Sequence, residues 1–262
     1  MLTIRNYVKA KSLEEAYELN QMKTNRILGG MMWLRMMHLN VGTAIDLCDL
    51  GLNTIEETDD EIILGAMVTL RQLELSACLN TYTHGAVADA VRDIVGVQFR
   101  NTATLGGSIF GRYGFSDVLT VFLALDTEVE LFKAGRVPLA EFAAMKKDRD
   151  LLVRLIVKKK PLQAAYLSMR GSRTDFPILT CGVSRIDGVY RASIGARPGP
   201  AVVVEDETGL LAGEITEESA AAFGEYVAET IRTGTNLRGS AAYRKHLTKV
   251  LTARGVLEAA AE

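Results

Sequence analysis

Hydrophobic positions in the first 150 residues switch repeatedly between helical spacing and short apolar runs. Helical spacing, with Ser12–Glu15 and Thr69–Gln72 as capping boxes, predicts helices. They are expected over residues 12–20, 69–77, 85–95 and 116–126, the last capped by Ser116 or Asp117. Short apolar runs predict strands over residues 25–28, 43–47, 61–66, 99–105 and 127–132. The first part of the chain is therefore predicted to mix helices with strands.

The pattern changes near residue 150, where three predicted strands follow one another without a helix between them. They are expected over residues 163–170, 177–186 and 189–196, with Asp187–Gly188 as a two-residue hairpin turn. Two helices are predicted last, over 216–232 and 240–255, the second running from Ser240 as N-cap to Gly255 as its end. The fold class predicted is α+β: a larger mixed α/β region, then an antiparallel sheet with helices, divided near residue 155.

Composition places the chain among ordinary globular proteins and argues against one class of partner, nucleic acids. Of its 262 residues 48% are hydrophobic, and the formal net charge of −2 disfavours a dedicated nucleic-acid binder. The one tight basic run, residues 157–161, is expected to be solvated. The N-terminus lacks the apolar segment of a signal peptide, and no apolar stretch has the length of a membrane helix. A soluble, cytoplasmic protein without membrane insertion is predicted.

Cysteines and histidines predict no metal site within this chain. Cys48, Cys78 and Cys181 are far apart and too few for a four-cysteine zinc or iron–sulfur site. Nothing in their spacing suggests a disulfide, which favours a reducing compartment. The three histidines are isolated and have no metal-ligand spacing.

Two glycine pairs each follow a strand-like stretch, in "NRILGGMMWL" (25–34) and "NTATLGGS" (101–108). Two tight turns are the simplest interpretation. The sharper interpretation is that the missing Cβ atoms let main-chain N–H groups form an anion-binding concavity. A run of good helix formers follows Gly30, and a loop leading to a helix at Ser116 follows Gly107, so both places suit a phosphate or diphosphate. Neither Rossmann nor P-loop spacing is present, so a dinucleotide would need another architecture.

Five motifs, in the right order, resemble the FAD-binding medium subunit of the molybdenum hydroxylases, the family of xanthine, carbon monoxide and nicotinate dehydrogenases. Residues 28–34 resemble the family's first flavin motif, A-G-G-T-D-L. "RNTATLGGS" (100–108) resembles the second and most specific motif, R-N-x-A-T-I-G-G-N. The other three motifs are "GAMVTLRQLE" (65–74), "FLALDTEVEL" (122–131) and "YRKHLTKVLTARG" (243–255). The resemblance covers nearly the whole chain.

The resemblance implies an FAD-binding domain of the vanillyl-alcohol-oxidase/PCMH type over residues 1–155, with subdomains of about 1–55 and 56–155, and a small α+β C-terminal domain over 160–262. In the family both glycine loops hold the FAD diphosphate and ribityl chain, and an acidic residue after the second loop lies at the adenine or ribose end. The cofactor-binding residues implied here are Ile27, Leu28, Gly29, Gly30, Met31, Met32, Trp33, Leu34, Ile94, Thr104, Leu105, Gly106, Gly107, Ser108 and Asp117. Tyr113 and Phe115 are candidates to lie near the isoalloxazine ring, with loop packing or a subunit contact as the alternative.

The chain departs from the family pattern in informative places. Met31-Met32 replaces Thr-Asp, so no threonine hydroxyl is available to a phosphate, and Ser108 replaces Asn. The stretch ahead of Arg170 lacks the lysine that the family often carries there. Losing a neutral hydrogen bond costs about 0.5–1.5 kcal/mol, so FAD is expected to bind less tightly than is usual for the family. The two methionines are equally interpretable as flexible core fillers.

The resemblance implies an electron-transfer flavoprotein with no catalytic residue acting on an organic substrate. Hydroxylation would take place at molybdopterin in a large partner subunit, and electrons would pass through [2Fe–2S] clusters of a small partner subunit to FAD and then to NAD+ or another acceptor. A purine is the expected substrate of the complex. A stand-alone FAD oxidoreductase of the same fold and a flavin-free scaffold subunit are the alternatives. The family branch with an extra iron–sulfur insert is excluded, because the cysteines are missing.

Overall fold

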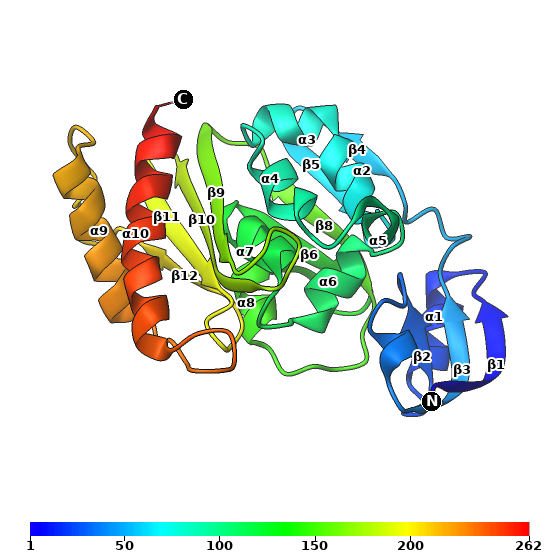
Figure 1. The fold of residues 1–262 in the computed structure, drawn as a ribbon. Helices are drawn as coiled ribbons and strands as arrows, with labels where there is room; N and C mark the ends of the chain where they lie inside the picture. The colour runs from blue at the N-terminus through cyan, green and yellow to red at the C-terminus, as the bar shows by residue number, and fades with distance from the viewer. Residues whose placement is uncertain (262) are drawn as a thin grey trace.

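A computed structural model describes residues 1–261 and places them in three sheets with helices between and outside them (Figure 1). The N-terminal sheet is parallel, with strand order β1-β3-β2. Its strands are β1 (Thr3–Lys9), β2 (Arg26–Leu28) and β3 (Asn40–Asp46). Helix α1 (Leu13–Asn20) connects β1 to β2, and a short 3₁₀ turn, η1 (Leu34–Met36), lies between β2 and β3. Leu151 and Val153, which are distant in sequence, join the small core under α1 and so tie this sheet to the rest of the molecule.

The second sheet has five antiparallel strands in the order β4-β5-β8-β6-β7. Its strands are β4 (Ile55–Glu57), β5 (Glu61–Gly65), β6 (Thr127–Leu131), β7 (Gly135–Pro138) and β8 (Leu152–Lys158). The helices that accompany it are α2 (Leu70–Leu75), α3 (Ala77–Tyr82), α4 (Ala86–Arg92), α5 (Val97–Arg100), α6 (Leu105–Gly111), α7 (Asp117–Ala124) and α8 (Leu139–Ala144). All eight residues of α7 are buried, and all but Asp117 and Thr120 are apolar, as expected for a helix packed between other layers.

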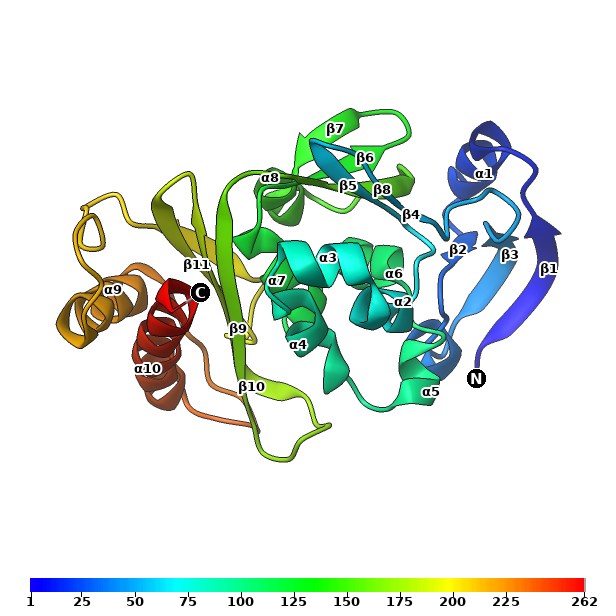
Figure 2. The ribbon, with the colours of Figure 1, turned by 90° about the horizontal axis from the view of Figure 1, so that it is seen from above.

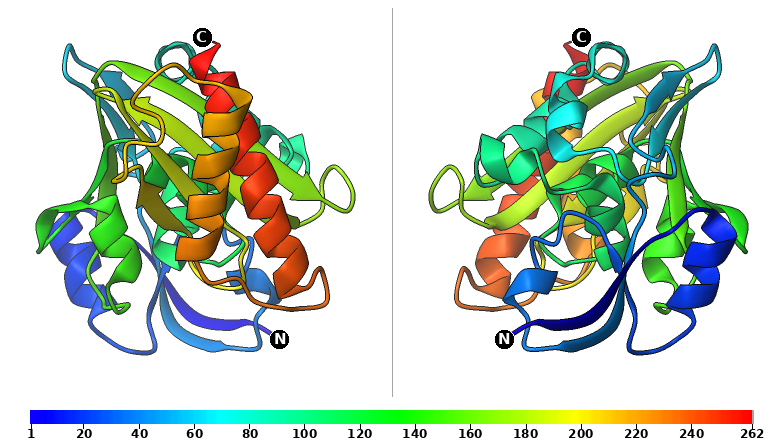
Figure 3. Two further views of the ribbon diagram at one scale, coloured as in Figure 1. Left: turned by 90° about the vertical axis from the view of Figure 1, so that its left-hand side faces the viewer. Right: turned by 90° about the vertical axis from the view of Figure 1, so that its right-hand side faces the viewer.

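The C-terminal sheet is antiparallel, in the order β12-β11-β10-β9. It is built from β9 (Leu162–Arg170), β10 (Pro177–Ile186), β11 (Val189–Gly195) and β12 (Val202–Glu205). α9 (Glu217–Thr230) and α10 (Ala241–Ala260) lie side by side on one face of it (Figure 3). α7 packs on the opposite face, where Gly182 and Gly195 come close to its backbone and Thr120. The N-terminal sheet and the α9–α10 pair lie at opposite ends of the molecule (Figure 2).

The α+β fold class is confirmed, and so are most predicted elements. Asp187 and Gly188 both have positive φ, 51° and 85°, as a type I′ hairpin turn between β10 and β11 requires. The helix predicted over 69–77 is divided in two, because Ser76 caps a new helix by accepting a hydrogen bond from the Leu79 N–H. Five strands are absent from the prediction: the short or polar strands β1, β4, β7 and β12, and the apolar strand β8.

Three local predictions are wrong. Residues 99–105 are not a strand: α5 ends at Arg100, and Thr104 then caps α6 by accepting from the Gly107 N–H, so the second glycine pair lies inside a helix. The helix formers after Gly30 make only the 3₁₀ turn η1, which has no side-chain cap. Gly255 does not end α10, which continues to Ala260; a Cβ at Gly255 would lie 2.7 Å from Val183 Cγ2, so this glycine allows close packing on the sheet.

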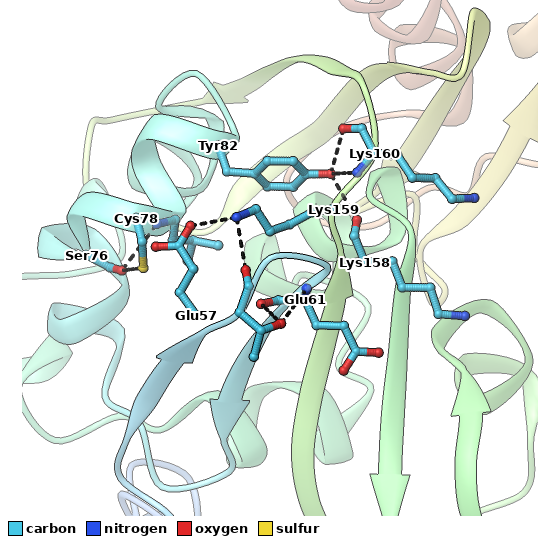
Figure 4. A network of polar contacts seen from close by, with 10 residues as sticks. Glu57, Glu61, Ser76, Cys78, Tyr82, Lys158, Lys159 and Lys160 are labelled. Atoms are coloured by element: carbon cyan, nitrogen blue, oxygen red, sulfur yellow. Dashed lines mark hydrogen bonds and ion pairs between the residues drawn. The ribbon is translucent and has the colours of Figure 1, made fainter.

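The basic run at the end of β8 is neutralised by carboxylates. Lys158 pairs with Glu128 at 2.6 Å, Lys159 with Glu57 at 2.9 Å, and Lys160 with Asp126 at 2.8 Å. The Tyr82 hydroxyl donates to the Lys158 carbonyl and accepts from the Lys160 N–H, which fixes the backbone of the run (Figure 4). The run is therefore part of the connection between α3 and the strands beside it.

No helix in the described part, residues 1–261, is both long enough and apolar enough to cross a bilayer.

Candidate flavin-binding cleft

A cavity of about 800 Å³ opens between the N-terminal sheet, the helices of the second layer and the start of β10. Four segments line it, namely residues 25–34, 103–118, 147–152 and 170–177, together with single residues such as Ile94. Its size is that of a typical site for a small organic ligand or cofactor.

The two glycine pairs meet at the wall of this cavity. A Cβ on Gly30 would lie 2.0 Å from the Thr102 carbonyl oxygen and 2.8 Å from the Ala103 Cα. A Cβ on Gly29 would lie 2.8 Å from Thr104 Oγ1, with the Gly107 Cα 3.8 Å away. The loop after β2 can therefore touch the start of α6 only because it carries no side chains there.

Main-chain N–H groups near the two pairs differ in availability. Within the described chain, no acceptor is found for the N–H groups of residues 29–34. The N–H groups at the second pair are occupied: Gly106 donates to the Ala66 carbonyl at 2.8 Å, and Gly107 to Thr104 Oγ1 at 3.2 Å. The expectation that both pairs present free N–H groups is wrong for the second, because those residues form the capped first turn of a helix.

Comparison with known proteins identifies the family. Residues 2–159 match the FAD binding domain in molybdopterin dehydrogenase, and residues 164–259 match the CO dehydrogenase flavoprotein C-terminal domain. The chain is an FAD-binding medium subunit of the molybdopterin hydroxylase family. The resemblance inferred from the motifs is therefore confirmed.

Members of this family that resemble the chain cover nearly its whole length. The nicotine 6-hydroxylase medium subunit of Paenarthrobacter nicotinovorans is 26% identical over 276 residues, 97% of either chain. The uncharacterized protein YgfM of Escherichia coli K12 is 26% identical over 256 residues, 95% of this chain and 94% of YgfM. A carbon monoxide dehydrogenase chain of Hydrogenophaga pseudoflava superposes with a TM-score of 0.85 at 22% identity, over 98% of this chain and 97% of that one, which shows the shared fold.

Almost every residue implied by the flavin motifs lines the cleft of this family member. Those that do are Ile27, Leu28, Gly29, Gly30, Met31, Met32, Trp33, Leu34, Ile94, Thr104, Gly106, Gly107, Ser108 and Asp117. Leu105 does not: its side chain is fully buried in the main core, and its N–H donates to the Val68 carbonyl. Helical geometry explains this, because Leu105 and the exposed Gly107 are two residues apart in α6 and therefore point to nearly opposite sides of the helix.

Met31, Met32 and Ser108, which depart from the family motifs, all pack or form hydrogen bonds within the structure. Met31 lies in the left-handed region, with φ 56°, and packs against the core of the N-terminal sheet. Met32 packs against the main core instead. Both also line the cleft, so packing and cofactor contact are compatible roles for them. The Ser108 hydroxyl donates to the Thr104 carbonyl at 3.0 Å and is occupied within α6.

Asp117 stands at the start of α7 in a buried polar cluster. Its Oδ1 accepts a hydrogen bond of 2.6 Å from the Tyr166 hydroxyl and a short contact from Arg170 Nη2. Burial raises the pKa of Asp117 to about 6, and the Arg170 charge only partly opposes that rise. Asp117 therefore joins the helix layer to β9 as well as lining the cleft.

The Asp117 carboxyl is expected to make stability depend on pH. Because its folded pKa of about 6 exceeds its ordinary value of 3.8, the stabilisation it contributes is fully present below about pH 4 and is lost as pH rises through about 6. The difference corresponds to about 3 kcal/mol. We expect the free energy of unfolding in urea to fall more between about pH 4 and pH 7 in the unmodified chain than in Asp117→Asn. Equal pH dependence in the two proteins would contradict this.

Sequence reasoning missed several residues of the cleft. Arg149 donates to the main-chain carbonyls of Asn20, Met22 and Asn25, and so holds the loop that leads into β2. Burial lowers the pKa of Arg149, and the neighbouring charge of Arg26 adds to the effect. No local signal marks Arg149, which stands in a polar stretch that resembles any surface loop. Phe176 was missed too, and only the tertiary structure brings it to the cleft.

Proposed function

We propose that this chain binds FAD in the cleft and works as the electron-transfer subunit of a molybdenum hydroxylase. The main support is the run of N–H groups at residues 29–34, which have no acceptor within the described chain and lie on a loop that lines a cofactor-sized cavity. Such a run suits the FAD diphosphate, because successive N–H groups bind anions. Bound FAD would supply the redox chemistry.

The chain's own residues divide the work of holding the cofactor. Gly29 and Gly30 let the loop approach both α6 and the ligand, while Met31 and Met32 supply apolar contact. Asp117, held by Tyr166 and Arg170, is proposed to contact FAD from the buried side of the cleft. Leu105 is withdrawn from this set because its side chain lies in the core.

Partner subunits are proposed from the family and from the name of a relative. The Paenarthrobacter nicotinovorans protein is named a medium subunit, which supports assembly of this chain with a large molybdopterin subunit and a small [2Fe–2S] subunit. Two functional statements stay predictions: the transfer of electrons to NAD+ or another acceptor, and a purine as the substrate of the complex. The division into domains at residues 155–160 also stays a prediction. Cytoplasmic localisation is likewise a prediction.

The first test is flavin binding by the purified full chain. We expect it to acquire flavin absorbance after incubation with excess FAD and removal of free ligand, to less than one FAD per chain if affinity is low. A colourless protein after this treatment would contradict the proposal and favour the flavin-free scaffold. Turnover of an organic substrate by the chain alone would instead favour a stand-alone flavoenzyme. Co-purification of the native complex with molybdenum and iron analysis tests the partners.

A further inference from the structure

Three aromatic rings from two other segments of the chain gather around Trp33 in the cleft. The Trp33 ring centroid lies 5.7 Å from that of Tyr113, 5.3 Å from Phe115 and 5.8 Å from Phe176. Tyr113 and Phe115 stack at 5.3 Å with an interplanar angle of 11°, and Phe115 meets Phe176 edge-on at 4.7 Å. We call these four residues the Trp33 cluster. All four line the cavity and all are half-buried, so part of each ring surface is accessible to a ligand.

The surroundings of the Trp33 cluster differ from those of the polar part of the cleft. Lys147 Nζ lies 5.7 Å from the Tyr113 centroid, and Arg238 Cζ lies 4.9 Å from the Phe176 centroid, so cations cover two outer rings. Asp117 and Arg170 also line the cavity near the cluster, but they are already paired with each other. A second group of polar side chains lies around Arg149, which contacts Asn20 and the Asn25 carbonyl. One part of the cleft thus suits a flat apolar ring system, and another suits a ligand rich in hydroxyl and amine groups.

We propose that Trp33 stacks on the isoalloxazine ring of bound FAD, with the rest of the cluster as the wall behind it; this rests on the proposed function. Trp33 follows Gly30 by three residues, on the same loop as the free N–H groups of residues 29–34. A diphosphate held by these groups leaves the flavin ring within reach of Trp33, because only the ribityl chain separates the two. The polar part of the cleft is then left for the adenosine.

The residue at this position departs from the family motif. Trp33 stands where the family's first flavin motif, A-G-G-T-D-L, carries leucine. An indole offers a larger flat surface than leucine, and aromatic stacking of this kind contributes to ligand affinity beyond simple burial. In this proposal, stacking on Trp33 offsets part of the binding energy lost with the hydroxyl that Met31 cannot supply.

The test compares FAD, FMN and ADP as ligands of the full chain and of Trp33→Leu. FMN carries the isoalloxazine ring without adenosine, and ADP carries adenosine without the ring. We therefore expect Trp33→Leu to bind FAD and FMN roughly tenfold more weakly than the unmodified chain and to bind ADP with unchanged affinity. Flavin emission from bound FAD, quenched by the indole in the unmodified chain, is expected to rise in the variant. Trp33 is the single tryptophan of the chain, so its own emission reports on the site; ADP is expected to leave it unchanged.

Controls separate stacking from folding. Tyr243→Leu removes an exposed aromatic residue outside the cleft and is expected to change neither affinity nor emission. If far-UV circular dichroism shows that Trp33→Leu is unfolded, Trp33→Phe replaces it. A phenyl ring keeps the flat surface but quenches flavin emission poorly. In Trp33→Phe the flavin emission should therefore rise, while the affinity for FAD should stay within about threefold of that of the unmodified chain. A loss of ADP affinity in Trp33→Leu would overturn the inference by placing adenine at Trp33. Unchanged FAD affinity and emission would overturn it while leaving FAD binding intact, whereas no flavin binding by the unmodified chain would overturn the proposed function.

Discussion

Gly30→Ala is expected to weaken FAD binding by roughly 100-fold, the upper end of what overpacking a tight contact costs. The new Cβ would lie 2.0 Å from the Thr102 carbonyl oxygen and 2.7 Å from its carbon. These are backbone atoms and cannot turn aside as the end of a side chain could. The loop after β2 would have to move away from α6 and would carry its N–H groups out of position. Titration of the full chain with FAD measures the effect.

Gly213→Ala is the matched control for this prediction. Nothing lies within 4 Å of a Cβ built on Gly213, so the same substitution there is expected to leave FAD affinity unchanged. Circular dichroism of Gly30→Ala separates loss of the fold from loss of the site. FAD binding by folded Gly30→Ala as tight as that of the unmodified chain would show that close contact between the two loops is not needed.

Arg244→Met is expected to destabilise the protein by about 3–5 kcal/mol. Arg244 is 1% exposed, and among residues 1–261 it forms no ion pair with a carboxylate. Its guanidinium donates to the carbonyls of Ile178, Ala196, Gly234 and Gly239 and to Asn236 Oδ1. Removing it takes this donor from the carbonyls of Ile178, Ala196 and Gly234, and each acceptor left unpaired costs about 1–3 kcal/mol unless water reaches it. The Gly239 carbonyl and Asn236 Oδ1 keep hydrogen bonds from main-chain N–H groups of the same loop. Urea unfolding monitored by circular dichroism measures the change.

Arg254→Met is the control for Arg244→Met, because it makes the same chemical change on the same helix. Arg254 is exposed, so its replacement is expected to alter the free energy of unfolding by no more than about 0.5 kcal/mol. A similar small effect at Arg244 would mean that the loop over residues 234–239 reorganises or hydrates at little cost.

Most of the cleft could be predicted from two short motifs, since the residues on either side of each glycine pair line it. The failures have physical causes. The pattern predicts a strand over residues 99–105, but Thr104 caps a helix there. The Gly106 and Gly107 N–H groups are therefore occupied, and Leu105 lies in the core. Arg149 could not be recognised, because its partners are main-chain carbonyls about 125 residues away in sequence.

The order of apolar runs, the capping residues and the two glycine motifs determined the α+β class, most elements and the family of this protein. These features are local, so they can be read along the chain. Only the tertiary structure decided that Gly30 faces Thr102 and that Trp33, Tyr113, Phe115 and Phe176 share one cluster. It also decided that, within residues 1–261, the N–H groups of the first glycine loop have no acceptor while those of Gly106 and Gly107 are occupied. Those facts depend on contacts between segments far apart in sequence, and the packing of three sheets sets these contacts, which no local pattern encodes.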